Sequence, residues 1–305
     1  MGLEDARGNR SAGSTAEAAA ALRAAGTLIG ERELANPDSM AAAFIAPGLR
    51  TSSLVKLPGL RRLAPRIIER MVPGGLWFEI ARTRGMDEVV EQEVAAGAGQ
   101  VVILGAGFDS RAYRMTDRLR SAVVFEVDHP ETSRRKRERV RAVVGQEPGW
   151  VRYVTLDFNR DDLAQALERQ GHDRSGRSVV VWSGVAPYLE PAGVDATLAW
   201  MAGQAPGSVI VFDYCWREMV EATESYAGAE TLRRRVAAQG EPFRFGIPRG
   251  RTREFLAQRG LELVEDMDAE QGMRRFLTRE DGTRVGWLWE FGGVARARVP
   301  DPKSP

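Results

Sequence analysis

The strongest constraint on this chain is a regular alternation of short apolar runs and stretches with helical spacing. Five runs have the length and composition of buried strands, and they lie at residues 101–104, 123–128, 150–157, 178–183 and 208–213. Parallel strands joined by helices form a doubly wound sheet, which binds its ligands at the carboxyl ends of the strands. The alternation therefore predicts an α/β protein, in which two later strands at 261–265 and 286–291 complete a sheet of seven.

A glycine turn follows the first apolar run. Gly105-Ala106-Gly107 lies between a strand and a segment with helical character, and glycine lets the backbone bend tightly and a ligand approach it. About twenty residues later the second run ends in two acids, Glu126 and Asp128, where a βαβ unit places a carboxylate beside a ribose. Dehydrogenases, methyltransferases and turns that bind nothing all contain Gly-X-Gly, so the turn alone leaves the ligand open.

The residues around the turn favour S-adenosylmethionine over a dinucleotide. A dinucleotide site usually has a third glycine where the helix meets the strand, and this chain has Ser110 there. S-adenosylmethionine carries no phosphate, and its adenine needs a polar and an apolar partner, which Asp157 and Phe158 could supply. Its carboxylate could pair with an arginine, for which Arg84 and Arg111 are candidates.

The composition is that of an ordinary globular protein. The 305 residues are 43% hydrophobic and carry a formal net charge of +1, so no strong field attracts nucleic acid or a membrane surface. The basic stretch 131–144 is interpreted as the solvated face of a helix. With one cysteine and two histidines, neither an intrachain disulfide nor a transition-metal site is expected. No apolar run approaches the roughly 20 residues of a membrane span, and the start lacks a signal-peptide pattern, so we expect a cytoplasmic protein.

Stretches rich in proline, glycine or charged residues mark the predicted domain boundaries. We expect a disordered start at 1–14, a helical cap at 15–97, a core at 98–297 and a tail at 298–305. A charged helical stretch after the fifth strand predicts a lid inserted at about residues 216–250.

Two strings in the core resemble the leucine carboxyl methyltransferase family of S-adenosylmethionine-dependent enzymes. They are Leu104-Gly-Ala-Gly-Phe-Asp-Ser-Arg-Ala-Tyr-Arg114 and Phe125-Glu-Val-Asp-His-Pro130, with Lys136 downstream. The resemblance runs from about Thr15 to Asp213 and includes Asn36-Pro37-Asp38 and Ala81-Arg-Thr-Arg84. It implies a Rossmann-like class I methyltransferase fold with a helical cap and lid, and S-adenosylmethionine as the cofactor.

The resemblance also implies roles for residues of the predicted sheet edge. Arg84 would hold the carboxylate of the cofactor, and the turn Gly105-Ala106-Gly107 would line its methionine end. Asp128 would hold the ribose, with Glu126 as the weaker candidate, and Asp157 and Phe158 would hold the adenine.

One position departs from the family pattern. After the fourth strand the family usually has a glutamate before a glycine, and this chain has Ser183 before Gly184, so a contact from that position to the cofactor is in question. Tyr188 and Leu189 match the pair that follows in the family.

The methyl acceptor is predicted from what the sequence lacks. No general base is evident, because His129 and His172 are interpreted as structural or exposed, and an ionised carboxylate needs none. We therefore expect O-methylation of a carboxylate or an acidic hydroxyl of a small molecule or peptide, and the family resemblance implies a place in secondary metabolism. Candidates for the acceptor pocket are Tyr188, Trp182 and Arg114, and no catalytic residue is assigned.

Two other functions stay open. A binding protein with this fold but no activity would explain the missing glutamate. An NAD(P)-dependent oxidoreductase is less favoured, because the chain has no Tyr-X-X-X-Lys pair or equivalent acids. The sequence gives no indication of the oligomeric state.

Overall fold

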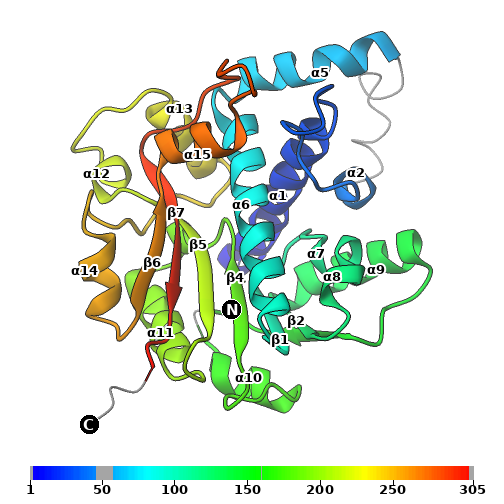
Figure 1. The fold of residues 1–305 in the computed structure, drawn as a ribbon, viewed down its shortest axis with the longest axis vertical. Helices are drawn as coiled ribbons and strands as arrows, with labels where there is room; N and C mark the ends of the chain where they lie inside the picture. The colour runs from blue at the N-terminus through cyan, green and yellow to red at the C-terminus, as the bar shows by residue number, and fades with distance from the viewer. Residues whose placement is uncertain (1–2, 46–57, 159, 302–305) are drawn as a thin grey trace.

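The computed structural model describes residues 3–45, 58–158 and 160–301, and it is built around one seven-stranded sheet (Figure 1). The strand order is β3-β2-β1-β4-β5-β7-β6, and β7 alone runs antiparallel to its neighbours. The strands are β1 (Gln100–Leu104), β2 (Val123–Asp128), β3 (Val151–Thr155), β4 (Ser178–Trp182), β5 (Val209–Cys215), β6 (Glu262–Met267) and β7 (Gly292–Arg298). The predicted doubly wound α/β sheet of seven strands is confirmed.

Each central strand is buried on both faces. Along β1, Val101 and Ile103 belong to one apolar cluster, whereas Val102 and Leu104 belong to the other. Such double burial explains why these strands are continuous apolar runs rather than alternating ones. One face is covered mainly by α6 (Gly75–Ala95) and α9 (Pro130–Val144), and the other by α10 (Leu163–Arg169), α11 (Pro191–Ala202) and α14 (Thr252–Ala257).

The register of the sheet brings several strand ends to one level. Leu104 of β1 lies opposite Val127 of β2 and Trp182 of β4, and Trp182 lies opposite Phe212 of β5. The segments that follow these four parallel strands therefore leave the sheet along one edge, as the alternation predicts.

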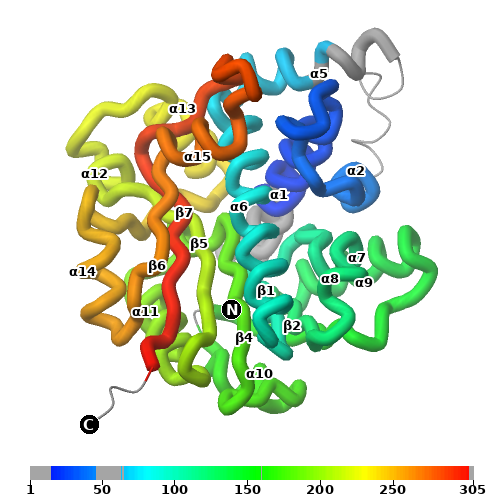
Figure 2. The backbone as a smooth tube through the Cα atoms, in the orientation of Figure 1, coloured from blue at the N-terminus to red at the C-terminus, as the bar shows by residue number. Residues whose placement is uncertain are grey.

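Helices before β1 cover this edge. They are α1 (Leu3–Gly26), α2 (Ala41–Phe44), α5 (Pro58–Met71) and α6, and the backbone tube shows α1 running beside α6 (Figure 2). Helix α1 begins at Leu3, although we expected no regular structure before residue 15. Once the alanine-rich segment has formed a helix, adding residues to its N-terminal end costs little free energy, because each added residue gains a hydrogen bond. Residues 46–57 of the expected cap and 302–305 of the expected tail lie outside the described residues.

The segment after β5 is helical, but it is not one helix. It forms α12 (Arg217–Val220) and α13 (Ala229–Ala238), and Gly228 before α13 has φ 78°, a left-handed conformation that favours glycine. Smaller elements are α7 (Arg111–Arg114), α8 (Thr116–Leu119), the 3₁₀ turn η1 (Ala186–Tyr188) and α15 (Ala269–Phe276). No described helix has the length and apolar character needed to cross a membrane.

The predicted last strand was wrong. The aromatic run 286–291 is irregular, and the strand is the following segment, β7. A Cβ at Gly292 would lie 2.1 Å from the carbonyl oxygen of Tyr214, so β7 can pair closely with β5 because glycine stands there. The aromatic run packs on the N-terminal helices instead, and the Nε1 of Trp289 donates to the carbonyl oxygen of Pro73 at 2.7 Å.

Candidate functional site

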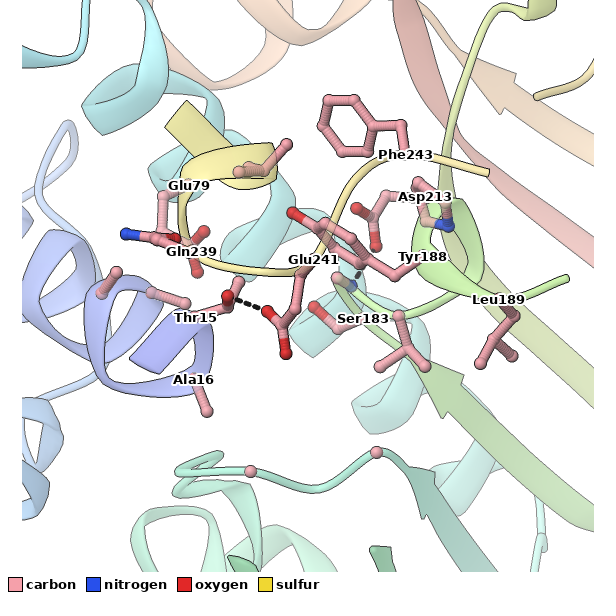
Figure 3. Close-up of a pocket in the computed structure, with 18 of the residues that line it drawn as sticks. Thr15, Ala16, Glu79, Ser183, Tyr188, Leu189, Asp213, Gln239, Glu241 and Phe243 are labelled. Atoms are coloured by element: carbon pink, nitrogen blue, oxygen red, sulfur yellow. Dashed lines mark hydrogen bonds between the residues drawn. The ribbon is translucent and has the colours of Figure 1, made fainter. Parts of the chain in front are cut away.

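A cavity of about 1200 Å³ opens at the shared edge of the sheet. Its floor comes from the ends of β1, β2, β4 and β5 and from the loop after β3, and its walls include α1, α6, α13 and the loop 239–244 (Figure 3). Seven of the nine residues predicted to bind the cofactor line it, namely Gly105, Ala106, Gly107, Asp128, Asp157, Phe158 and Ser183. We call the part formed by these seven residues the glycine-turn half.

The glycine turn has the conformation that its sequence requires. Gly105 has φ 61° and Gly107 has φ 41°, so both lie in the left-handed region. A Cβ at Gly105 would lie 2.3 Å from a methyl group of Val185, within the wall of the cavity. A side chain at this position would therefore strain the backbone and occupy the space above the turn.

Asp128 joins the glycine turn to the end of β2. One carboxylate oxygen accepts from the backbone N–H of Gly107, and the other accepts from that of His129 at 2.7 Å. Burial raises the pKa of Asp128, while these two hydrogen bonds lower it. A carboxylate oxygen accepts more than one hydrogen bond, so Asp128 keeps acceptor capacity toward the cavity.

Glu126, the weaker ribose candidate, does not line the cavity. Its carboxylate is buried in the sheet, where the Nζ of Lys136 lies 2.7 Å away and the hydroxyl of Tyr113 donates at 2.9 Å. The side chains of Glu126 and Lys136 are each 2% exposed, so this is a buried ion pair. Glu126 and Asp128 are two residues apart in β2, so their side chains leave the same face of the sheet. Only Asp128, at the end of the strand, reaches the cavity, whereas Glu126 lies further back beside Tyr113 and Lys136.

Arg84 also lies outside the cavity, and Arg82 lines it instead. An Nη of Arg84 donates to the carbonyl oxygen of Ala35 at 3.0 Å. Arg111, the other candidate, is committed to Asp87 at 2.8 Å and to Asp109. The sequence analysis did not propose Arg82 for the cofactor carboxylate, although it stands in the same Ala81-Arg-Thr-Arg84 string as Arg84.

Arg82 is the centre of a buried charge cluster. Its Nη1 donates to Asp213 at 2.8 Å and its Nη2 to Glu79, one helical turn earlier. Asp213 also accepts from the backbone N–H of Gly184 at 2.6 Å, and Glu79 lies 3.4 Å from Arg23. The Nε of Arg82 is buried and has no hydrogen-bond partner among the described residues. The two acids keep Arg82 cationic, since they raise the pKa of its guanidinium against the opposing effect of burial.

Of the three predicted acceptor-pocket residues, Tyr188 lines the cavity. Trp182 is fully buried in the core beneath the sheet, in contact with Phe212. Arg114 lies outside the cavity and donates to Asp87 at 2.7 Å and to Ser110 at 3.0 Å.

Aromatic side chains dominate the second part of the cavity, which we call the aromatic half. It consists of Phe78, Tyr188, Phe243, Trp289 and Phe291. The rings of Tyr188 and Phe243 lie 5.2 Å apart, those of Phe78 and Trp289 5.1 Å, and those of Trp289 and Phe291 5.5 Å. Three of these rings come from segments outside the predicted strands and glycine turn, so spacing along the sequence gave no signal for their convergence.

Glu241 is a second residue that sequence reasoning missed. It follows α13, and its carboxylate accepts a hydrogen bond from the hydroxyl of Thr15 in α1 across the cavity (Figure 3). Burial raises the pKa of Glu241, and the hydrogen bond from Thr15 opposes that shift. The residue stands in a loop between Gly240 and Pro242 with no motif around it, so nothing in the sequence pointed to it.

The described residues contain no group of three or more histidine, cysteine, aspartate or glutamate side chains that could hold a metal ion. The single cysteine, Cys215, lines the cavity at the end of β5 with a pKa raised by burial.

Comparisons with known proteins agree with this arrangement. The profile of the leucine carboxyl methyltransferase family matches residues 16–202. YktD of Bacillus subtilis, provisionally named an S-adenosyl-L-methionine-dependent methyltransferase, is 29% identical over 63% of this chain and 63% of its own length. A provisionally named S-adenosyl-L-methionine-dependent methyltransferase of Mycobacterium tuberculosis, Rv0281, is 41% identical over 37% of this chain and 36% of its own. The chain thus spans less than two thirds of the length of these relatives.

Solved structures share the fold. A protein from Thermobifida fusca, provisionally described as a methyltransferase, aligns with a TM-score of 0.56 over 79% of this chain and 89% of its own, at 18% identity. A DUF574 family protein from Streptomyces avermitilis aligns equally well, over 79% and 91%.

Proposed function

The chain belongs to the leucine carboxyl methyltransferase family, and from that premise we propose that it transfers a methyl group from S-adenosylmethionine to an oxygen atom of a small molecule or peptide. One observation supports this most strongly. Asp128 faces the cavity at the end of β2 and is fixed to the glycine turn by the N–H of Gly107. A carboxylate so placed can accept hydrogen bonds from both hydroxyls of a ribose.

We assign the methionine chain and the adenine of the cofactor to the glycine-turn half as well. The left-handed turn at Gly105 and Gly107 leaves room for the methionine chain, while Asp157 and Phe158 receive the adenine. We assign the cofactor carboxylate to Arg82 in place of Arg84, because Arg82 lines the cavity and has an unpaired Nε–H. Asp213 and Glu79, which hold Arg82, also give this end of the cavity the negative charge that suits an ammonium group.

Bound S-adenosylmethionine supplies a methyl group on a sulfonium, which is already a good leaving group. The protein therefore contributes position and exclusion of water rather than activation of the leaving group. Asp128 and the glycine turn would hold the nucleoside, and the aromatic half would receive the acceptor. Helix α1 and the loop 239–244 cover the cavity, so they keep water from the reacting atoms.

Calorimetric titration with S-adenosylmethionine, with its demethylated product and with NADH tests the proposal. We expect the first two to bind and NADH not to bind. Asp128→Ala should weaken cofactor binding at least tenfold, about 1.4 kcal/mol, because the ribose loses its acceptor. Asp117→Ala, which removes an exposed aspartate of α8, should leave the affinity unchanged. Binding of NADH alone, or unchanged affinity in Asp128→Ala, would contradict the assignment.

A further inference from the structure

The position of Glu241 restricts which acceptor the cavity can take, and this inference rests on the proposed methyl transfer. The carboxylate of Glu241 faces the cavity from the loop after α13, and Figure 3 draws it beside the ring of Tyr188. The two side chains interact electrostatically, since Glu241 contributes to the raised pKa of Tyr188. Glu241 therefore borders the aromatic half, where the acceptor would lie.

Glu241 has no cationic partner in the described structure. Its hydrogen bond is to the neutral hydroxyl of Thr15, and only that bond opposes the effect of burial on its pKa. A half-buried carboxylate without a counterion is a stronger base than an exposed one, because burial disfavours its charged form. Transfer of a proton from a bound ligand to Glu241 would neutralise this unfavourably buried charge.

Four of the five described arginines around the cavity are already paired with an acid. Arg82 is held by Asp213 and Glu79, Arg23 by Asp38 at 2.8 Å, and Arg244 by Glu190, and Arg160 lies 3.7 Å from Asp157. The fifth, Arg235, donates to the carbonyl oxygen of Met71 at 2.9 Å. A carboxylate acceptor in the aromatic half would therefore meet the like charge of Glu241 beside arginines that mostly have an acid already, which is unfavourable in a partly buried site.

We propose that Glu241 is the general base for a neutral hydroxyl acceptor, and that the acceptor is a flat apolar molecule of the phenol class. The acceptor oxygen attacks the methyl carbon, so that the C–O bond forms as the C–S bond breaks. The sulfur keeps the electron pair and leaves as the neutral thioether of the product. The hydroxyl proton passes to a carboxylate oxygen of Glu241, which returns it to water after the product leaves. The faces of the aromatic half provide the apolar contact for the ring.

Binding of two matched probes tests the choice of acceptor. Calorimetry on the protein saturated with the demethylated cofactor would compare 2-naphthol with 2-naphthoate, which differ in the charge of the oxygen group. We expect 2-naphthol to bind at least tenfold tighter, and Glu241→Gln to reduce this preference at least threefold, because it removes the repelling charge. Tighter binding of 2-naphthoate, failure of 2-naphthol to bind, or an unchanged preference in Glu241→Gln would overturn the proposal.

Kinetics with 2-naphthol as the methyl acceptor test the proton transfer. Glu241→Gln should lower kcat about 100-fold, within the usual contribution of a general base, and change KM less than threefold. Glu221→Gln is the matched control. It makes the same change at an exposed glutamate that does not line the cavity, so it should keep kcat within threefold of the wild type. Equal losses in the two variants, or a bound 2-naphthol that is not methylated, would overturn the proposal.

The outcome separates this inference from the proposed function. If the protein binds the cofactor and methylates 2-naphthoate but not 2-naphthol, the assignment of Glu241 fails while oxygen methylation stands. If neither the methylated cofactor nor its product binds, the proposed function itself fails.

Discussion

Buried charge pairs determine how single residues at this site depend on one another. Arg82 is the cationic partner of Asp213 and shares Glu79 with Arg23, and the side chains of Arg82, Asp213 and Glu79 are each less than 10% exposed. Buried ion pairs add little net stability when intact, but removal of one partner is costly because the other charge stays behind. On the proposed assignment, stability and cofactor binding would therefore depend on the same residue.

We predict that Arg82→Ala lowers the free energy of unfolding by about 3–5 kcal/mol, because Asp213 loses its counterion and Glu79 keeps only Arg23, at 3.4 Å. Arg84→Ala is the control, since Arg84 makes its hydrogen bond to a neutral carbonyl oxygen, and its cost should be about 1 kcal/mol. Urea denaturation followed by circular dichroism measures both. Equal losses of unfolding free energy in the two variants would show that the charge cluster contributes no more to stability than the single hydrogen bond of Arg84.

The raised pKa of Glu241 predicts how stability changes with pH. The folded state holds its proton more tightly than the unfolded state, so ionisation costs stability as the pH rises above the unfolded pKa of about 4.5. Glu241→Gln should therefore raise the Tm of the ligand-free protein at pH 8 by more than at pH 5. Thermal scans of the wild type and the variant at the two pH values check this. If the Tm of Glu241→Gln at pH 8 does not exceed that of the wild type, burial of the ionised carboxylate does not destabilise the protein.

At the scale of elements, the sequence predicts the strands well because each central strand is buried on both faces. A run such as Ser178-Val-Val-Val-Trp182 can hardly be exposed, and the structure places it at the centre of the sheet. Strand β7 was missed because its sequence, Gly-Gly-Val-Ala-Arg-Ala-Arg, is weakly apolar. Its pairing depends on close approach to β5, which follows from the tertiary structure and not from propensity.

Helix α6 explains why Arg82 rather than Arg84 lines the cavity. The helix begins at Gly75 and includes both residues. Two residues apart on a helix, side chains point about 200° from each other, so only one of the two could face the cavity. The family string identifies the segment but does not give the rotation of the helix against the sheet, which depends on packing.

The close pairing of β7 with β5 can be tested by adding one methyl group at Gly292. In Gly292→Ala the added Cβ would meet the carbonyl oxygen of Tyr214 at 2.1 Å, so either β5 or β7 must shift. We expect a loss of about 3 kcal/mol in unfolding free energy, at the upper end for overpacking. Gly99→Ala, where an added Cβ meets nothing within 4 Å, should be nearly neutral. A neutral Gly292→Ala would mean that the two strands are less closely paired.

At the scale of the whole molecule, the cavity is enclosed by parts of the chain that are far apart in sequence. Helix α1 meets the loop after α13 through Thr15 and Glu241, and both lie over the sheet edge that carries the glycine turn. Neither the sequence alternation nor the glycine motif indicates this meeting, because the contact spans more than 200 residues.

Hydrogen exchange with and without the demethylated cofactor tests the enclosure. Because the ligand would fill the cavity beneath α1 and the segment 229–244, we predict slower amide exchange in both segments on binding. Helix α10 contributes no residue to the cavity lining and should exchange at an unchanged rate. Protection confined to the glycine turn would show that the covering segments do not respond to the ligand.

Much of the aromatic half comes from a later part of the chain than the glycine-turn half. The glycine-turn half comes from residues 105–183, whereas Glu241, Phe243, Trp289 and Phe291 all follow residue 240. On the proposed assignment, mutations in the later segment would alter the choice of acceptor without changing the contacts to the nucleoside. Relatives with the same glycine turn could then differ in the acceptor that they methylate. Exchanging residues 239–244 between two of them is the smallest change that could transfer the acceptor preference of one to the other.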